Sequence, residues 1–284
     1  MSIIMKGAPV AKKIQENLEE EVLELKRNGK NPSMTFVRVG HREDDLVYQR
    51  SAQKRMNKIG IECNVLAIEE DAPEEEVIRK ISEVNADPSV DGILLFRPLP
   101  HHLHEEILKN CIDPKKDVDG MRDENISKIF DGNAMGFAPC TAEAVVELLD
   151  YYGIETAGKN AVIIGRSRVI GKPVSMLLLT KDATITICHR KTENLEEICK
   201  RADILVVAAG CKNIVTADMV SDKCYVIDVG INVNADGDIC GDVDYEVLKD
   251  KVAGITPVPG GVGGITTAIL ANHVVRAAKG MTIK

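Results

Sequence analysis

The residues that could do chemistry begin with a glycine-bearing turn in residues 161–173, AVIIGRSRVIGKP. Its first four residues form the kind of apolar run that fills a parallel strand covered on both faces. Gly165 allows a tight turn after that strand, and Gly171 lets the next helix begin close to it. The first N–H groups of such a helix, with the helix dipole, suit a pyrophosphate. Because the middle glycine of G-x-G-x-x-G is missing, an ordinary strand-to-helix turn fits the pattern equally well.

A second run of β-forming residues, 184–188, ends in cations that could recognise a nucleotide. An NAD site usually carries an acid at the end of this strand, where it accepts from the ribose 2′-hydroxyl, whereas a 2′-phosphate needs cations there. This chain supplies Arg190 and Lys191, with Arg166 in the glycine turn. The pattern favours NADP over NAD, although solvated loop charges would give the same sequence.

The composition is typical of a two-domain enzyme. The 284 residues allow two domains of ordinary size, and 44% hydrophobic with 28% charged residues indicates a soluble globular protein. No apolar run approaches a membrane span and no secretory signal opens the chain, so we expect a cytoplasmic protein that does not bind membranes. The net charge of −8 argues against nucleic acid as a partner, because neutralising phosphates needs a basic face.

Cysteine and histidine are placed without the spacing of a metal site. The eight cysteines are scattered with no C-x-x-C pair, which predicts small core residues in a reducing compartment. His101, His102 and His104 lie in one loop, where neighbouring histidines cannot all face one ion. We therefore expect a surface turn there and no metal.

The elements that must position these residues alternate between helix and strand, which predicts parallel α/β sheets. The final helix is long enough to return to the first domain, and a domain boundary is expected near residue 140. Substrate is expected in the cleft between the two halves, at the carboxyl ends of the strands. The expected helices are 8–28, 44–58, 73–84, a short one within 101–121, 141–152 and 265–278, and the expected strands are 34–40, 61–68, 91–100, 161–164, 184–188, 203–208 and 224–229.

Several separate stretches point to one family. The chain resembles the bifunctional methylenetetrahydrofolate dehydrogenase/cyclohydrolases from end to end, in the order and spacing of VGHREDDLVYQR, DGILLFRPLP, KKDVDG, PCT, GRSRVIGKP, CHRKT, DVGIN and TPVPGGVGGIT. The resemblance implies a folate-binding catalytic domain in 1–140, joined by a returning helix in 265–284, and a Rossmann-type NADP domain in 141–264. It also implies a homodimer and a tetrahydrofolate derivative as the small-molecule substrate.

The chemistry that the resemblance implies has two steps. Hydride passes from the methylene carbon of 5,10-methylenetetrahydrofolate to NADP, which leaves the 5,10-methenyl cation; water then adds, and the ring opens to 10-formyltetrahydrofolate. Hydride transfer asks the protein chiefly for placement. Water addition asks for more, because a positioned group must handle protons in step with the attack.

The resemblance assigns roles to individual residues. Tyr48 falls on the family's substrate-stacking tyrosine and Asp119 on the aspartate that binds the pterin ring, which makes them the expected catalytic pair. An ionised Asp119 could accept two hydrogen bonds from the ring's amidine edge, or it could instead cap a turn. The matched substrate-loop positions are Pro257, Gly260, Gly261 and Val262, and the matched cofactor positions are Gly165, Arg166, Ser167, Ile170, Gly171, Arg190 and Ile231.

The chain departs from the family pattern at positions that cluster around the substrate pocket. Ala52 stands where the family has its acid/base lysine, Phe96 where it has the partner glutamine, and Arg97 where it has leucine. Alanine and phenylalanine make the pocket drier, which suits the survival of a cation better than its hydration. Further exchanges are Asp45 for a serine and Ala142 and Gly264 for two prolines.

Three functional hypotheses follow. The first is an NADP-dependent methylenetetrahydrofolate dehydrogenase whose cyclohydrolase activity is weak or absent. The second is a fully bifunctional enzyme that uses a relocated basic residue, Lys54 or Arg97; Lys54 lies about 120° away from the helix face of Tyr48. The third is a non-catalytic or altered-substrate paralogue that binds a nucleotide or a folate.

Overall fold

The computed structural model describes residues 2–132, 136–234 and 237–280 and divides the chain into two compact units. The six-stranded unit comprises Met1–Lys12 and Thr141–Thr266, and the three-stranded unit comprises Lys13–Cys140 and Thr267–Lys284. The predicted two-domain α/β fold, with a C-terminal helix that returns to the first domain, is confirmed.

The division differs from the predicted one at the N-terminus. Residues 1–12 group with 141–266, whereas the sequence assigned them to the first domain. The reason is strand β1 (Ile3–Ile4), which pairs in parallel with β11 (Gly254–Ile255). Two-residue strands carry too little periodicity for a sequence pattern to reveal them.

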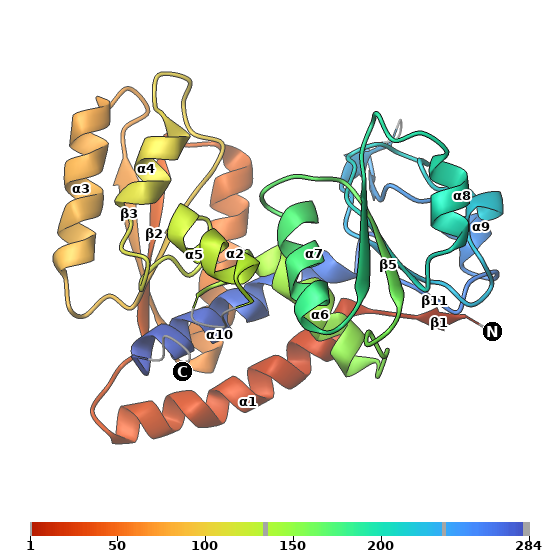
Figure 1. The fold of residues 1–284 in the computed structure, drawn as a ribbon. Helices are drawn as coiled ribbons and strands as arrows, with labels where there is room; N and C mark the ends of the chain where they lie inside the picture. Colours follow the sequence, from red (N-terminus) through yellow and green to blue (C-terminus); the bar gives the residue numbers. More distant parts are fainter. Residues whose placement is uncertain (1, 133–135, 235–236, 281–284) are drawn as a thin grey trace. The chain divides into compact units, whose positions relative to one another are not determined.

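The three-stranded unit is built on a parallel sheet of order β3-β2-β4 (Figure 1). Every residue of β2 (Ser33–Val39) is buried, as expected for a central parallel strand. Its neighbours are β3 (Glu62–Ile68) and β4 (Gly92–Leu95). The sequence predicted a strand over 91–100, but β4 ends at Leu95 because the two prolines that follow lack the N–H that a ladder needs.

The helices of this unit largely follow the predicted ranges. The additional helix α5 was not predicted, since its eight residues are shorter than the windows that reveal helical periodicity. The helices are α1 (Gly7–Arg27), which begins in the other unit, α2 (Glu43–Ile59), α3 (Glu74–Ala86), α4 (Glu105–Cys111), α5 (Asp123–Phe130) and α10 (Thr266–Ala278).

The last helix, α10, packs into the three-stranded unit (Figure 1). His273 is fully buried, and its Nδ1 donates to the carbonyl of Val118 at 2.7 Å. Its ring lies 5.0 Å from that of Phe137, and Arg276 donates to the carbonyl of Gly136 at 3.2 Å. These contacts hold the C-terminal helix against the loop that carries Asp119.

The six-stranded unit is a Rossmann-type parallel sheet of order β1-β11-β8-β7-β5-β6. Strand β5 lies between β6 and β7, so the chain leaves it to one side and later returns on the other. This reversal is a topological switch point, where ligands of such sheets bind. The elements are α6 (Cys140–Tyr151), β5 (Asn160–Ile164), α7 (Gly171–Thr180), β6 (Thr184–Cys188), α8 (Leu195–Lys200), β7 (Ile204–Val207), β8 (Tyr225–Asp228), the antiparallel pair β9 (Asn232–Val233) and β10 (Ile239–Cys240), and α9 (Tyr245–Leu248).

Of the helices in the described residues, none combines the length and the apolar character that crossing a bilayer would require.

Candidate functional site

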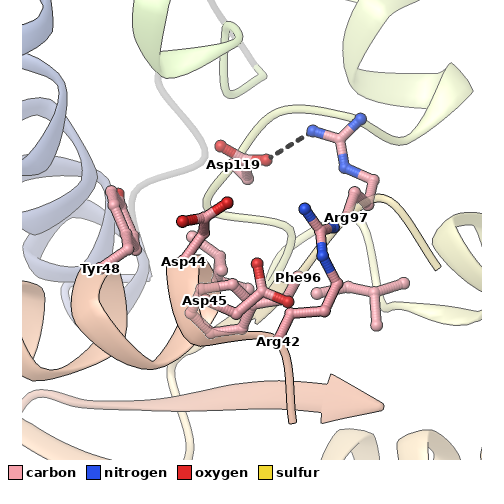
Figure 2. Close-up of a pocket in the computed structure, with 9 residues that line it drawn as sticks. Arg42, Asp44, Asp45, Tyr48, Phe96, Arg97 and Asp119 are labelled. Carbon is pink, nitrogen blue, oxygen red and sulfur yellow. Dashed lines mark hydrogen bonds and ion pairs between the residues drawn. The ribbon is translucent and has the colours of Figure 1, made fainter. Parts of the chain in front are cut away.

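Four of the predicted site residues line one pocket of the three-stranded unit, with a volume of about 350 Å³ (Figure 2). The pocket opens at the carboxyl end of β4, which is where ligands of parallel sheets usually bind. Helix α2 and the residue before it supply one wall, the end of β4 supplies the second, and the loop before α5 supplies the third. The lining residues are Arg42, Asp44, Asp45, Tyr48, Leu94, Leu95, Phe96, Arg97 and Asp119.

Helix α2 sets the position of Tyr48. Its first turn carries three acids, which suit the positive end of the helix dipole, and Gly60 ends it in the left-handed conformation at φ 95°. Tyr48, Ala52 and Met56 follow at intervals of four and share one face, of which Ala52 and Met56 are buried. Tyr48, the first of them, keeps 38% of its surface exposed beside the pocket.

Phe96 points into the pocket and joins it to the core. The side chain is 7% exposed, and its ring lies edge-on to Tyr48, with 5.9 Å between ring centroids. On its other side Phe96 contacts Phe36 of β2, again at 5.9 Å. Phenylalanine neither donates nor accepts a hydrogen bond, so this wall fixes the tyrosine ring and offers the ligand an apolar surface.

Position 52 holds no group that could exchange a proton. Ala52 is 1% exposed and lies one helical turn after Tyr48 on the buried face. Among the residues that the structure describes, no lysine lines the pocket. Lys54 is exposed and is not a lining residue, so of the two predicted substitutes only Arg97 lies at the pocket.

Arg97 joins two acids at the mouth of the pocket. Its Nη2 donates to Oδ2 of Asp119 at 3.2 Å (Figure 2). Its Nη1 donates to Oε1 of Glu105 at 3.2 Å. The Arg97 and Asp119 side chains are only 21% and 26% exposed, so the pair is partly withdrawn from water.

The pKa of Asp119 is raised to about 6. Burial is the main cause, and the nearby Asp117 carboxylate adds to it, while Arg97 and His273 act in the opposite direction. Asp119 is therefore mostly ionised at neutral pH and takes up a proton in mild acid.

The turn around Asp119 is held by a different aspartate. Asp117 is buried and accepts from the N–H groups of Met121 and Arg122, at 3.2 and 2.8 Å, and from Nδ2 of Asn125 at 2.8 Å. The turn-capping role that the sequence left open for Asp119 belongs to Asp117. Asp119 is thus available to the pocket.

Asp45 is one of three carboxyls in the pocket wall, with Asp44 and Asp119. It is buried, and burial raises its pKa while the nearby Arg42 and Arg38 lower it and Asp44 raises it. The sequence identified Asp45 as a departure from the family pattern but gave it no role.

In the glycine turn of the six-stranded unit, backbone atoms lie so close to Gly165 and Gly171 that neither position has room for a Cβ. Gly165 has φ 128°, and a Cβ there would lie 2.2 Å from the carbonyl oxygen of Ala208, which follows β7. A Cβ on Gly171 would lie 2.1 Å from the carbonyl oxygen of Gly165. Both positions require glycine, and α7 begins at Gly171, beside the switch point between β5 and β7. These residues fit a pyrophosphate approaching the backbone.

The predicted cofactor side chains surround this edge. Arg166 and Ser167 are exposed in the turn, where the Ser167 hydroxyl accepts from the N–H of Ile170 at 3.1 Å. Arg190 is exposed just after β6, the strand beside β5, and Ile231 follows β8 with 70% of its surface exposed. The cations are free to meet a phosphate because they are solvated.

The predicted substrate loop, 257–262, belongs to the six-stranded unit. The N–H of Gly7 donates to the carbonyl of Gly260 at 2.8 Å, and a Cβ on Gly7 would lie 2.0 Å from the carbonyl oxygen of Gly261. Pro257 is half-buried and Val262 buried. The loop is anchored at the start of α1, and its place against the pocket stays a prediction, as does a cleft between the halves.

Sequence reasoning missed two buried aspartates that organise the carboxyl edge of the six-stranded sheet. Asp242 accepts from the N–H groups of residues 209, 210 and 211, at 2.7, 2.9 and 2.9 Å, and from Nδ2 of Asn232 at 2.8 Å. Asp228 accepts from the N–H groups of residues 230, 242 and 243. The two carboxyls tie together the loops after β7 and β8. For Asp228 the available signal was an aspartate at the end of an apolar strand, as in YVIDVG.

The loop histidines have separate partners. His102 Nε2 lies 3.0 Å from the carbonyl oxygen of Ala72, and His104 Nδ1 lies 2.9 Å from Oε2 of Glu74. Across 2–132, 136–234 and 237–280, no three His, Cys, Asp or Glu side chains are grouped so that they could hold a metal ion.

Fold and site together define a class. One unit has a parallel sheet with a glycine edge, formed by Gly165 and Gly171, at its switch point. The other parallel α/β unit carries an aromatic and acidic pocket. This is the arrangement of two-domain dinucleotide-binding enzymes.

Comparison with known proteins identifies the family within this class. Residues 5–119 match the tetrahydrofolate dehydrogenase/cyclohydrolase catalytic domain, and residues 139–282 match the NAD(P)-binding domain of the same family. The chain is 52% identical over 276 residues to the bifunctional protein FolD of Clostridioides difficile strain 630, covering 97% of this chain and 96% of that protein. The chain belongs to the tetrahydrofolate dehydrogenase/cyclohydrolase family.

Solved structures agree. The bifunctional FolD enzyme of Campylobacter jejuni superposes with a TM-score of 0.96 at 38% identity, covering 99% of each chain. The FolD of Trypanosoma brucei, solved with NADP cofactor and an inhibitor, superposes with a TM-score of 0.91 at 32% identity, covering 98% of this chain and 97% of that one. The family resemblance and the NAD(P)-binding domain predicted from the sequence are confirmed.

Proposed function

We propose that the chain is an NADP-dependent dehydrogenase that oxidises 5,10-methylenetetrahydrofolate to 5,10-methenyltetrahydrofolate, with little or no cyclohydrolase activity. Family membership supports the dehydrogenase. The single observation that supports a limited second activity is the pocket, which keeps Tyr48 and Asp119 but has Phe96 at the family's glutamine position. The family's lysine position, one helical turn after Tyr48, is the buried Ala52. Folate binding is assigned to 1–140 with 265–284, and NADP binding to 141–264.

NADP, when bound, accepts the hydride from the methylene carbon. Gly165 and Gly171 would let its pyrophosphate approach the start of α7, and Ser167 and Ile170 line that turn. Arg190 would meet the 2′-phosphate, with Arg166 across the turn. The NADP complex of the Trypanosoma brucei relative supports NADP over NAD.

The substrate is held by its ring. Asp119, ionised at neutral pH, accepts hydrogen bonds from the pterin, while the Tyr48 ring stacks on it. Phe96 holds the tyrosine ring by an edge contact, so the stacking surface is fixed before the substrate arrives. The residues of 257–262 would contact the substrate from the other unit.

Hydrolysis of the methenyl cation needs a group that takes a proton from the attacking water. The pocket's two described cations, Arg42 and Arg97, are guanidiniums, which stay protonated and cannot exchange a proton. Burial raises the pKa of the Tyr48 hydroxyl, so it does not ionise near neutral pH. The described lining residues also include three carboxyls, those of Asp44, Asp45 and Asp119, and Asp119 is engaged by Arg97 and, in this proposal, by the pterin. We therefore expect most of the methenyl product to leave intact.

A fully bifunctional enzyme is the second candidate. Its support is the position of Arg97 beside Asp119, the carboxyl of Asp45 in the same wall, and the bifunctional relatives. A folate- or nucleotide-binding protein without this turnover is the third, and it is favoured by the guanidinium that already occupies one oxygen of Asp119. Calorimetry distinguishes it, because NADP binding without tetrahydrofolate binding would indicate a changed ligand, and binding of both without turnover a non-catalytic role.

The test follows NADPH and methenyl absorbance together in one reaction. The proposal expects one methenyl molecule to accumulate per NADPH and then to decay at the rate of an enzyme-free blank. Decay well above that blank would support the bifunctional candidate, and Arg97→Ala and Asp45→Asn would then show which side chain is responsible.

Assembly and compartment are also proposals. The resemblance to the family supports a homodimer, and light scattering at two protein concentrations tests it. A cytoplasmic location is expected from the sequence.

A further inference from the structure

Arg97 and Asp119 present a hydrogen-bond donor and an acceptor side by side in the pocket. One N–H of Nη2 donates to Oδ2 of Asp119 (Figure 2). One N–H of Nη1 donates to Oε1 of Glu105. Within the described part of the chain, Oδ1 of Asp119 and the remaining N–H groups of Arg97 have no partner. A ligand can therefore find a free acceptor and a free donor within one ion pair.

Both groups are held in place before a ligand arrives. Glu105 holds the guanidinium from the start of α4. The backbone beside Asp119 is fixed by Gly120 at φ 67°, where a Cβ would lie 2.4 Å from the carbonyl carbon of Ala138, and by the bonds of Asp117. A pre-positioned pair of this kind discriminates between ligands by hydrogen-bond pattern.

A carboxylate next to a guanidinium is complementary to an N–H next to a C=O. This is the lactam edge of a 4-oxopteridine, in which N3–H donates and O4 accepts. We infer that Arg97 is a specificity-determining residue, which donates to O4 of the pterin while Asp119 accepts from N3–H and the 2-amino group. Phe96, beside it, has no polar group that could share this task. The inference rests on the proposed function, since it takes the pterin as the ligand of Asp119.

The 4-amino-4-deoxy counterpart of tetrahydrofolate presents the opposite pattern. Its 4-amino group is a donor that faces the donors of Arg97, so an intact Arg97 disfavours it. Arg97→Leu removes the donor of the hydrogen bond to O4, and it also removes the unfavourable contact between two donors in the 4-amino ligand. If the role of Arg97 were merely structural, Arg97→Leu would weaken the binding of both ligands by the same factor.

The experiment compares wild type with Arg97→Leu, Arg97→Lys and the control Arg79→Leu, which removes an exposed guanidinium paired with Glu83 in α3. Calorimetry at pH 8 measures tetrahydrofolate and its 4-amino-4-deoxy counterpart, and a parallel assay measures kcat and KM for 5,10-methylenetetrahydrofolate. We expect Arg97→Leu to raise KM about 10- to 100-fold with kcat nearly unchanged, and to lower the 4-oxo preference by a similar factor. Arg97→Lys should recover part of both, and Arg79→Leu should match wild type.

The outcomes separate the inference from the proposed function. Turnover by wild type with an unchanged 4-oxo preference in Arg97→Leu would overturn the inference and leave the dehydrogenase proposal standing. If wild type binds tetrahydrofolate without turnover, the proposed function fails, and the binding comparison still decides the role of Arg97. Equal loss of both ligands in Arg97→Leu, or no pteridine binding by wild type, would overturn the inference.

Discussion

The glycine edge of the six-stranded unit is shaped by backbone atoms, whereas the pocket of the three-stranded unit is shaped by side chains. At the edge, backbone atoms occupy the space that a Cβ on Gly165 or Gly171 would need, so the geometry itself demands glycine. In the pocket, side chains such as Phe96 and Arg97 supply the surface, and each can change while the strand behind it stays in place. The comparison teaches that backbone geometry fixes the nucleotide-binding turn, whereas the surface of the pocket can change through a few side chains.

The largest effect that this comparison predicts is at the edge. Gly165→Ala would place a Cβ 2.2 Å from the Ala208 carbonyl oxygen, so the turn must move and NADP affinity should fall at least about 100-fold, measured by calorimetry. Gly158→Ala is the matched control, because Gly158 also has a positive φ, 72°, but open space around it. Its cost should be about 1–2 kcal/mol of stability with NADP affinity unchanged. Equal NADP affinity in Gly165→Ala and wild type would contradict the steric account.

The next effect is in the pocket. Asp119→Asn removes the charge that accepts from the pterin, so KM for 5,10-methylenetetrahydrofolate should rise about 100-fold, as expected for two charge-assisted hydrogen bonds that are weakened together. NADP affinity should stay as in wild type, because the glycine edge belongs to the other unit. A change in NADP affinity with normal KM for folate would reverse the assignment of the two units.

The pH dependence of kcat/KM tests the role of Asp119 in the pocket. The pKa of Asp119 is about 6, raised from 3.8 by burial, and only the ionised form accepts two hydrogen bonds. kcat/KM should therefore be level above pH 7 and fall about tenfold per pH unit well below pH 6. Besides burial, the side chains that shift the pKa of Asp119 are Arg97, Asp117 and His273. Because Arg97 lowers this pKa, Arg97→Leu should move the acid limb to higher pH, and an unmoved limb would assign it to another group.

The smallest effect concerns the residue that the pocket does not use. Lys54→Ala should change both the dehydrogenase rate and the methenyl decay less than about twofold, because Lys54 is exposed and does not line the pocket. The same two absorbance traces measure it. A lost decay phase in this variant would show that the lysine reaches the substrate after all.

The sequence predicted most of the long elements because their periodicity is local. Helices α1, α2 and α10 and the buried strand β2 lie close to their predicted ranges. Strands β1 and β11 were beyond reach, since two-residue strands become visible only when residues 3 and 254 meet in space. β4 was predicted too long because the apolar run of its sequence continues past the residue where its ladder stops.

The candidate site was predictable where the family pattern named a position and not where a contact decides its role. In KKDVDG either aspartate could cap the turn, and only the structure shows that Asp117 does so. Arg97 bonds both Asp119 and Glu105, which lie 22 and 8 positions from it in the sequence, and no local pattern predicts such contacts. That Phe96 faces Tyr48 likewise depends on how β4 and α2 pack.

The central claim is that the pocket takes a reduced pterin but lacks the lysine and glutamine to which the family resemblance assigns the protons of water. The measurement that tests it most directly is the decay of 5,10-methenyltetrahydrofolate with wild type and with the double variant Ala52→Lys, Phe96→Gln. Wild type should match the enzyme-free blank. The double variant, which places an amine one helical turn after Tyr48 and an amide at position 96 of the pocket wall, should accelerate decay at least about tenfold. Fast decay with wild type, at a rate that the double variant leaves unchanged, would contradict the account.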